Sequence, residues 1–151
     1  MTQTALLDVN VLLALFDRDH THHDVAHDWM ADAAGRQWAT CAATQNGFMR
    51  VTSNPTSRTG VFRVVDAADF LRRFCSSTHH VFWDESVSLV DRSLFDLAHV
   101  SGHRQVTGVY LLGLATKKGG TFVTFDAAVP LKAVLGATRR HLIVLGQAYE
   151  T

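Results

Sequence analysis

The sequence predicts an α/β protein with three layers, α/β/α, in which helices cover both faces of a mostly parallel sheet of about five strands. Short apolar runs alternate along the chain with helical patterns, and this alternation is typical of crossover connections between parallel strands. The chain has 151 residues, of which 47% are hydrophobic and 19% charged, so it is long enough to form one domain with a buried core.

The expected strands are short and apolar, and the expected helices have apolar residues at spacings of three and four. The strands are residues 5–7, 38–42, 80–83, 121–125 and 141–145. The helices are residues 11–16, about 24–34, 44 to the stop at Asn54-Pro55, 66–75, and a last helix that ends at Lys117-Lys118. Gly35 marks the end of the second helix, and no repeat or linker divides the chain.

The last helix is unusual at its start. Residues 109–115 are too apolar for a surface helix, so we expect this helix to be buried on nearly all sides. The hydroxyl of Thr107 is expected to cap it. The next residue, Gly108, is the poorest helix former after proline. It either begins the helix or stands where a working side chain is missing.

The overall charge limits the possible partners. The formal net charge is zero, so RNA binding would have to use a local basic patch.

Cys41 and Cys75 are far apart and form no CxxC motif, which favours buried thiols in a reducing compartment over a disulfide. The N-terminal segment has no basic region and is interrupted by Asp8 and Asn10, so we expect neither a signal peptide nor a membrane span, and a cytoplasmic location.

Aspartates directly follow three of the predicted strands, at Asp8, Asp84 and Asp126. In parallel sheets the chemistry gathers outside the carboxyl ends of the strands. Mg²⁺ or Mn²⁺ is held by one or two carboxylates together with water and phosphate oxygens, and such an ion can activate a water molecule against a phosphodiester. The alternative for each aspartate is a helix cap. The pattern leaves both interpretations open.

Most of the chain resembles a known family. The segments LLDVNVLLALFDRDHTHHDVAHDWM, WATCAATQNGFMRVTSN, FDLAHVSGHRQVTGVYLLGLATKKGGTFVTFDAAV and HLIVL resemble, in this order, the PIN-domain family, and most of all its VapC toxins. The resemblance implies a single PIN-like domain over residues 1–147, with residues 148–151 as a tail. It also implies a homodimeric endoribonuclease that uses Mg²⁺ or Mn²⁺, acts on RNA, is silenced by a cognate antitoxin protein, and needs neither a membrane nor an organic cofactor.

The family's site has four acidic positions, and this sequence matches two of them. The first falls on Asp8, and the fourth falls on Asp126, with Thr124 in the place of a commonly polar neighbour. The second, normally Glu, falls on Gln45, and the third, normally Asp, falls on Gly108. The resemblance therefore makes Asp8, Asp126, Gln45 and Thr124 the catalytic candidates and Asp8 and Asp126 the metal ligands.

Two missing acids are expected to weaken metal binding and to impair cleavage. Gln45 offers a carbonyl oxygen without charge, and Gly108 offers no side chain. Either natural loss or a disarming substitution would place a glycine there. Another acid would compensate only if the fold brings it close; the available ones are Asp84, Asp91 and Asp96. A catalytically inactive PIN-like module that binds antitoxin or RNA is the alternative function. A nucleotide-binding or phosphatase-like protein is disfavoured because no glycine-rich phosphate loop is present.

Basic and imidazole side chains add weaker signals. Arg50, Arg58 and Arg63 flank or lie in the polar segment around Pro55, and arginine suits phosphate, so they are the RNA-binding candidates. Four histidines lie within eight residues: His20, His22, His23 and His27. His23 and His27 have a spacing that can bind zinc, but no Cys or Glu completes a set, so packing beside Trp29 and loop hydrogen bonds are expected instead.

Overall fold

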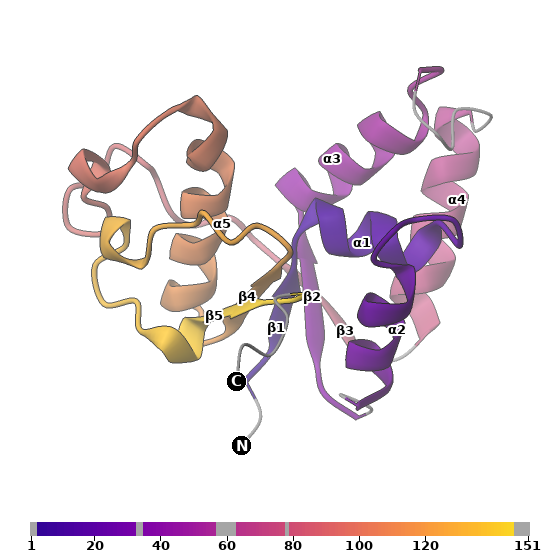
Figure 1. Ribbon diagram of the computed structural model, residues 1–151, viewed down its shortest axis with the longest axis horizontal. Helices are drawn as coiled ribbons and strands as arrows, with labels where there is room; N and C mark the ends of the chain where they lie inside the picture. Colours follow the sequence, from indigo (N-terminus) through magenta and orange to yellow (C-terminus); the bar gives the residue numbers. More distant parts are fainter. Residues whose placement is uncertain (1–2, 33–34, 57–62, 78, 147–151) are drawn as a thin grey trace.

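A five-stranded sheet forms the centre of the protein (Figure 1), as seen in a computed structural model that describes residues 3–32, 35–56, 63–77 and 79–146. The strands are β1 (Ala5–Leu7), β2 (Trp38–Cys41), β3 (His80–Trp83), β4 (Thr121–Thr124) and β5 (Leu142–Val144). Their order in the sheet is β3-β2-β1-β4-β5, and every neighbouring pair is parallel. The predicted parallel sheet is thereby confirmed.

Helices cover both faces of the sheet. Figure 1 shows four of them on one side: α1 (Val9–Phe16), α2 (His23–Asp32), α3 (Ala42–Thr52) and α4 (Val64–Ser77). α5 (Val106–Lys117) lies on the other side. Successive residues of a strand point to opposite faces. Accordingly Ala5 and Leu7 join the core under α1, whereas Leu6 joins the core under α5. The three-layer architecture is therefore the predicted one.

Helix starts differ from the predictions because local hydrogen bonds form earlier than the apolar pattern begins. α1 begins at Val9, since the Asp8 carboxylate accepts a bond from the Val9 N–H and caps the helix. α3 begins at Ala42, and Thr44 lies inside its first turn, where the Thr44 hydroxyl contacts the backbone N–H and C=O of Cys41. α4 is longer than predicted at both ends.

The strand ends also differ slightly. β2 stops at Cys41 and β4 stops at Thr124, one residue before their predicted ends. β5 begins at Leu142 because residues 139–141 form a 3₁₀ turn.

The predicted cap of α5 is wrong. The helix begins at Val106, and Thr107 is an exposed residue of its first turn rather than the cap. Gln105 occupies the capping position without a capping side-chain bond. Its amide instead donates to the Ala128 carbonyl at 2.9 Å and accepts from the Ser101 N–H at 2.8 Å. Contacts between loops therefore fix the start of α5.

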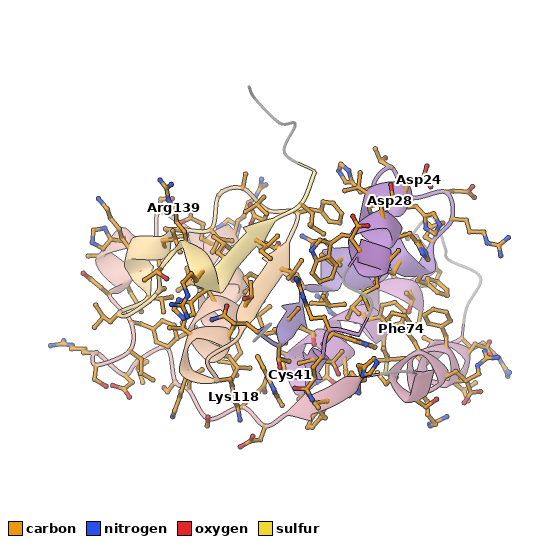
Figure 2. All side chains as sticks on the ribbon, turned by 90° about the horizontal axis from the view of Figure 1, so that it is seen from below. Asp24, Asp28, Cys41, Phe74, Lys118 and Arg139 are labelled. Carbon is orange, nitrogen blue, oxygen red and sulfur yellow. The ribbon has the colours of Figure 1, made fainter. Side chains whose placement is uncertain are left out.

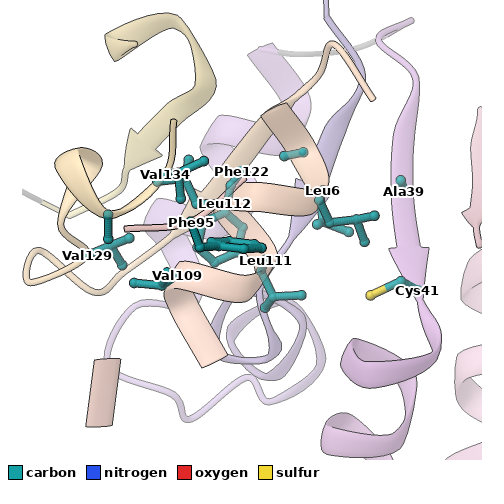
Figure 3. Packing of buried hydrophobic residues seen from close by; sticks show 13 residues of the cluster. Leu6, Ala39, Cys41, Phe95, Val109, Leu111, Leu112, Phe122, Val129 and Val134 are labelled. Atoms are coloured by element: carbon teal, nitrogen blue, oxygen red, sulfur yellow. The ribbon is translucent and has the colours of Figure 1, made fainter. Parts of the chain in front are cut away.

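The centre of α5 is buried as predicted, from Val109 through Leu114 and Ala115. Part of this burial comes from the long connection between β3 and α5, whose Phe95 packs in the same cluster (Figure 3). Phe95 is only 3% exposed, and a Cβ atom added at Gly113 would lie 2.2 Å from its ring. The glycine therefore allows the ring to lie directly on the helix. Among the described residues, no helix has the length and apolar character needed to cross a bilayer.

Candidate active site

Asp8 and Thr124 meet where two neighbouring strands end. Leu7 of β1 is paired with Val123 of β4, so the next residues, Asp8 and Thr124, lie level at the carboxyl edge of the sheet. The Thr124 hydroxyl donates to Asp8 Oδ2 at 2.7 Å, and the Val9 N–H donates to Asp8 Oδ1 at 2.7 Å. Asp8 thus caps α1, but each of its oxygens still has room for another contact. Capping and metal binding are compatible at this residue.

Asp126 joins the same hydroxyl from the other side. Its backbone N–H donates to Thr124 Oγ1 at 3.0 Å, and its Oδ1 accepts from the Ala128 N–H at 2.9 Å. Thr124 itself is fully buried. The structure therefore brings three of the predicted site residues together: Asp8, Thr124 and Asp126.

Asn10 completes this network, although it was not among the site residues predicted from the sequence. The Asn10 amide donates to Thr124 Oγ1 at 3.3 Å, and its Oδ1 accepts from the Phe125 N–H at 3.2 Å. Because the Thr124 oxygen accepts bonds from Asn10 and from Asp126, its single hydrogen is directed to Asp8.

The electrostatics of the acid pair favour a cation. Burial raises the pKa of Asp8, the hydrogen bonds from Thr124 and Val9 lower it, and the charge of Asp126 raises it again. No ion pair with either aspartate occurs within the described ranges. Two carboxylates are oxygen ligands of the kind that Mg²⁺ and Mn²⁺ accept, so Asp8 and Asp126 fit one such ion. Within the part of the chain that the structure describes, no third His, Cys, Asp or Glu completes a metal-binding group.

Gly108 lies where a side chain would face the acid-bearing loop. It is the third residue of α5, and a Cβ atom added to it would lie 3.0 Å from Val129 Cγ2. Val129 follows Asp126 by three residues. A side chain at position 108 would therefore emerge beside the loop that begins with Asp126, provided that the Val129 methyl group yields by a few tenths of an ångström.

Gln45 has a different set of partners. It lies in the first turn of α3, and its Nε2 donates to the buried Thr40 hydroxyl at 3.0 Å. His80 Nε2 contacts the same hydroxyl at 2.7 Å. Gln45 also lines a hollow between α3 and α4 together with Met49 and Leu71. Its amide N–H is thus committed to Thr40, and its predicted catalytic role stays a prediction.

The other acids near the strand ends have partners of their own. Asp84 is exposed and contacts Lys118 Nζ at 2.5 Å, and this ammonium group holds the pKa of Asp84 below its usual range. Asp91 accepts bonds from the Ser93 N–H and hydroxyl, and Asp96 caps a 3₁₀ turn. None of the three joins Asp8 and Asp126 in a metal-binding group of described residues.

Glu85, adjacent to Asp84, has a more specific environment that no sequence pattern indicates. Its Oε1 accepts from the Ala43 N–H at 3.1 Å, at the first turn of α3. Burial, together with the charge of Glu85 and a hydrogen bond to it, raises the pKa of Tyr110 to about 12. The pKa of the Cys41 thiol is also raised, first by burial and further by Glu85. Only the fold distinguishes Glu85 from Asp84.

Of the arginine candidates, Arg50 is exposed in the last turn of α3, and Arg63 is exposed and pairs with Asp66 at 3.3 Å. Arg58 lies outside the described residues. Two of the histidines contact the end of α1: His23 Nδ1 lies 2.7 Å from the Ala14 carbonyl, and His27 Nε2 lies 3.1 Å from the Leu15 carbonyl.

Comparisons with known proteins identify the family. The model of the PIN domain matches residues 5–134. Ribonuclease VapC44 of Mycobacterium tuberculosis is 48% identical over 141 residues, which cover 93% of this chain and 99% of the relative. Ribonuclease VapC39 of the same species is 40% identical over 133 residues, covering 88% of this chain and 96% of the relative. Ribonuclease VapC38 is 42% identical over 125 residues, covering 83% and 86%. The chain therefore belongs to the PIN-domain family and is of the VapC type.

Proposed function

We propose that this protein is an endoribonuclease that depends on Mg²⁺ or Mn²⁺ and is the toxin of a type II, VapBC-like toxin–antitoxin pair. The observation that carries the proposal is the pair of aspartates, Asp8 and Asp126, arranged around the Thr124 hydroxyl without a cationic partner among the described residues. The relatives named as ribonucleases support the same activity.

In this proposal Asp8 and Asp126 hold the ion. When bound, the ion supplies Lewis-acid chemistry at the phosphate and lowers the pKa of an attacking water molecule. Thr124 and Asn10 orient the Asp8 carboxylate toward the shared face of the two aspartates. Gln45 keeps its Oε1 as a neutral acceptor for RNA or for water, since its Nε2 is held by Thr40. Arg50, Arg58 and Arg63 remain the proposed contacts to RNA phosphates.

We further propose that the activity is reduced relative to a site with four acids. The attraction between the site and a divalent ion grows with the number of carboxylates, and this site has two of them. The ion is then held weakly, and the described residues offer no group of ligands to a second ion. The proposed partners are RNA, a cognate antitoxin protein and a second copy of the chain, in the cytoplasm, where free thiols such as Cys41 and Cys75 persist.

The second candidate function is a catalytically inactive PIN module that binds antitoxin or RNA. The glycine at position 108 favours it, because this position faces the Asp126 loop and contributes no ligand. The two candidates differ only in whether the acid pair supports chemistry.

An RNA cleavage assay tests the proposal. Total RNA is incubated with the wild-type chain, Asp8→Asn and Asp84→Asn, in Mn²⁺, in Mg²⁺ and in EDTA. We expect slow cleavage by the wild type that requires the metal, is abolished in Asp8→Asn, and is unchanged in Asp84→Asn, whose carboxylate is exposed and paired with Lys118. Cleavage that persists in Asp8→Asn would contradict the proposed site. RNA binding without cleavage by any of the three would favour the inactive module.

A further inference from the structure

A polar hollow lies where the strands begin, at the edge of the sheet opposite to Asp8 and Asp126. Its volume is about 450 Å³, and it is lined by Gln3, Arg36, Thr121, Arg139, Arg140 and Ile143. Arg36 precedes β2, and Arg139 and Arg140 form the 3₁₀ turn before β5. Figure 2 views the protein from this edge and labels Arg139. Thr121 and Thr124 are the first and last residues of β4, so the hollow is distinct from the acid pair.

The hollow carries concentrated positive charge. Among the residues that the structure describes, three arginines line it and no acidic residue does. Within the described ranges, none of these arginine side chains forms an ion pair or a hydrogen bond. Two arginines elsewhere do form ion pairs: Arg63 with Asp66, and Arg72 with Asp69. In a chain of zero net charge, this hollow is a local basic patch of the kind that RNA binding requires.

Arg36 provides the second observation. Its Nε atom is buried and has no hydrogen-bond partner among the described residues. Its guanidinium carbon lies 5.7 Å from the centre of the Trp29 ring, a distance that allows a cation–π contact to hold the group in place. Native structures rarely leave a buried N–H without an acceptor, so the position of this side chain depends on its other contacts. The Trp29 contact therefore holds the Arg36 guanidinium at the wall of the hollow.

We infer that this hollow, formed by Arg36, Arg139 and Arg140, binds a phosphate group of an RNA chain. The planar guanidinium group presents paired donors that match the oxygens of a phosphate. Gln3 adds donors, because its Oε1 accepts from the Thr121 hydroxyl at 2.7 Å and its Nε2 is left for the ligand. The inference rests on the proposed ribonuclease function and extends it with an RNA contact outside the catalytic edge.

The two edges are close enough for one RNA strand to reach both. Thr121 begins β4 and Asp126 follows its end by two residues, so the two edges are separated by about the length of this four-residue strand, roughly 13 Å. An RNA strand of several nucleotides can span such a distance while one phosphate lies near Asp126 and another in the hollow. The hollow then contributes affinity without contributing to the chemistry.

A binding experiment without metal tests the inference. The affinity of a fluorescent single-stranded RNA is measured by anisotropy in EDTA over a range of salt concentrations, for the wild type, the double variant Arg139→Gln/Arg140→Gln, and Arg36→Gln. The matched control is Arg92→Gln, because Arg92 is exposed and lines neither this hollow nor the one beside Gln45. We expect the slope of log K against log salt to decrease by about 0.7 for each phosphate that the variant no longer binds, with affinity weakened about fivefold or more, and an unchanged slope in the control.

An unchanged slope in both hollow variants would overturn the inference, and so would binding of inorganic phosphate that added RNA fails to displace. A measurement on the wild-type chain covers the case in which a variant does not fold: the Arg36 Nε–H resonance should shift when RNA is added, and its constancy would equally overturn the inference. If the wild-type chain cleaves RNA with metal but the salt dependence of RNA binding is the same in the hollow variants, the inference fails and the proposed function is retained. If the chain binds RNA in this hollow but does not cleave it under any condition tested, the inference is retained and the proposed nuclease activity fails.

Discussion

The Thr124 hydroxyl is the centre of the acid pair, and Thr124→Val removes it while keeping a β-branched side chain of similar volume. Thr124 is fully buried, and its hydroxyl donates to Asp8 Oδ2 at 2.7 Å. A hydrogen bond to a charged group contributes about 1.5–3 kcal/mol, and the loss of an acceptor for Asn10 and for the Asp126 N–H adds about 1 kcal/mol. We therefore expect the free energy of unfolding at neutral pH and in EDTA to decrease by about 2.5–4 kcal/mol.

The loss should depend on pH in a direction set by Asp8. Burial and the charge of Asp126 already raise the folded-state pKa of Asp8 above its ordinary value of 3.8. An acid with a raised folded-state pKa favours the folded state most below its unfolded pKa, and this contribution is lost as pH rises through the folded-state pKa. Because Thr124→Val removes a bond that lowers the Asp8 pKa, the pKa rises further, and the variant loses more stability at neutral pH than near pH 3.8.

Urea denaturation at neutral and at acidic pH measures this difference. Thr121→Val is the matched control: Thr121 lies at the other end of β4, and among the described residues its hydroxyl contacts neutral oxygens, on Gln3 and on the Arg140 carbonyl. We expect it to decrease the free energy of unfolding by about 1 kcal/mol at both pH values. If Thr124→Val has the same deficit at both pH values, the hydroxyl does not stabilise the Asp8 carboxylate and the reasoning fails.

Two further predictions concern the scaffold. Gly113→Ala places a Cβ atom 2.2 Å from the Phe95 ring and should decrease the free energy of unfolding by about 1–3 kcal/mol. Gly102→Ala, whose Cβ atom meets no atom within 4 Å, should leave the free energy of unfolding nearly unchanged, and urea denaturation of both variants measures the difference. Burial lowers the pKa of His80 below 6.5, so the contribution of His80 to the free energy of unfolding should be fully present above pH 6.5 and should be lost as pH falls below it. In His80→Gln, which can still contact the Thr40 hydroxyl, urea denaturation between about pH 7.5 and 5.5 should show a smaller decrease in the free energy of unfolding than in the wild type. An equal decrease in both chains would contradict the assignment to His80.

Much of the fold was predictable because its signals are local. Alternating apolar runs located all five strands, and the apolar centre of α5 identified its burial. The start of α5 was not predictable, because Gln105 holds it through Ala128, which is distant in sequence. The long connection before α5 was equally hidden, since Phe95 is placed by the space above Gly113 rather than by a periodic pattern.

The candidate site was predictable in part, for the same reason. Asp8 and Asp126 follow strands, and the order of the strands brings their ends together. The role of Asn10 depends on a bond to Thr124 that spans 114 residues, so no neighbouring residue reveals it. The distinction between Glu85 and Asp84 depends on which carboxylate reaches the first turn of α3. The arginine hollow unites Arg36 with a turn about a hundred residues later, and only the fold shows it.

Calorimetric titration with Mn²⁺ tests the central claim that Asp8 and Asp126 form a metal site weakened by the glycine at position 108. The chains compared are the wild type, Asp8→Asn, Gly108→Asp and Gly108→Ala, the last of which adds the Cβ atom near Val129 without a charge. We expect weak binding by the wild type, none by Asp8→Asn, binding tightened about tenfold or more by Gly108→Asp, which corresponds to about 1.4 kcal/mol, and no change in Gly108→Ala. Mn²⁺ affinity that is the same in the wild type and in Asp8→Asn would contradict the claim.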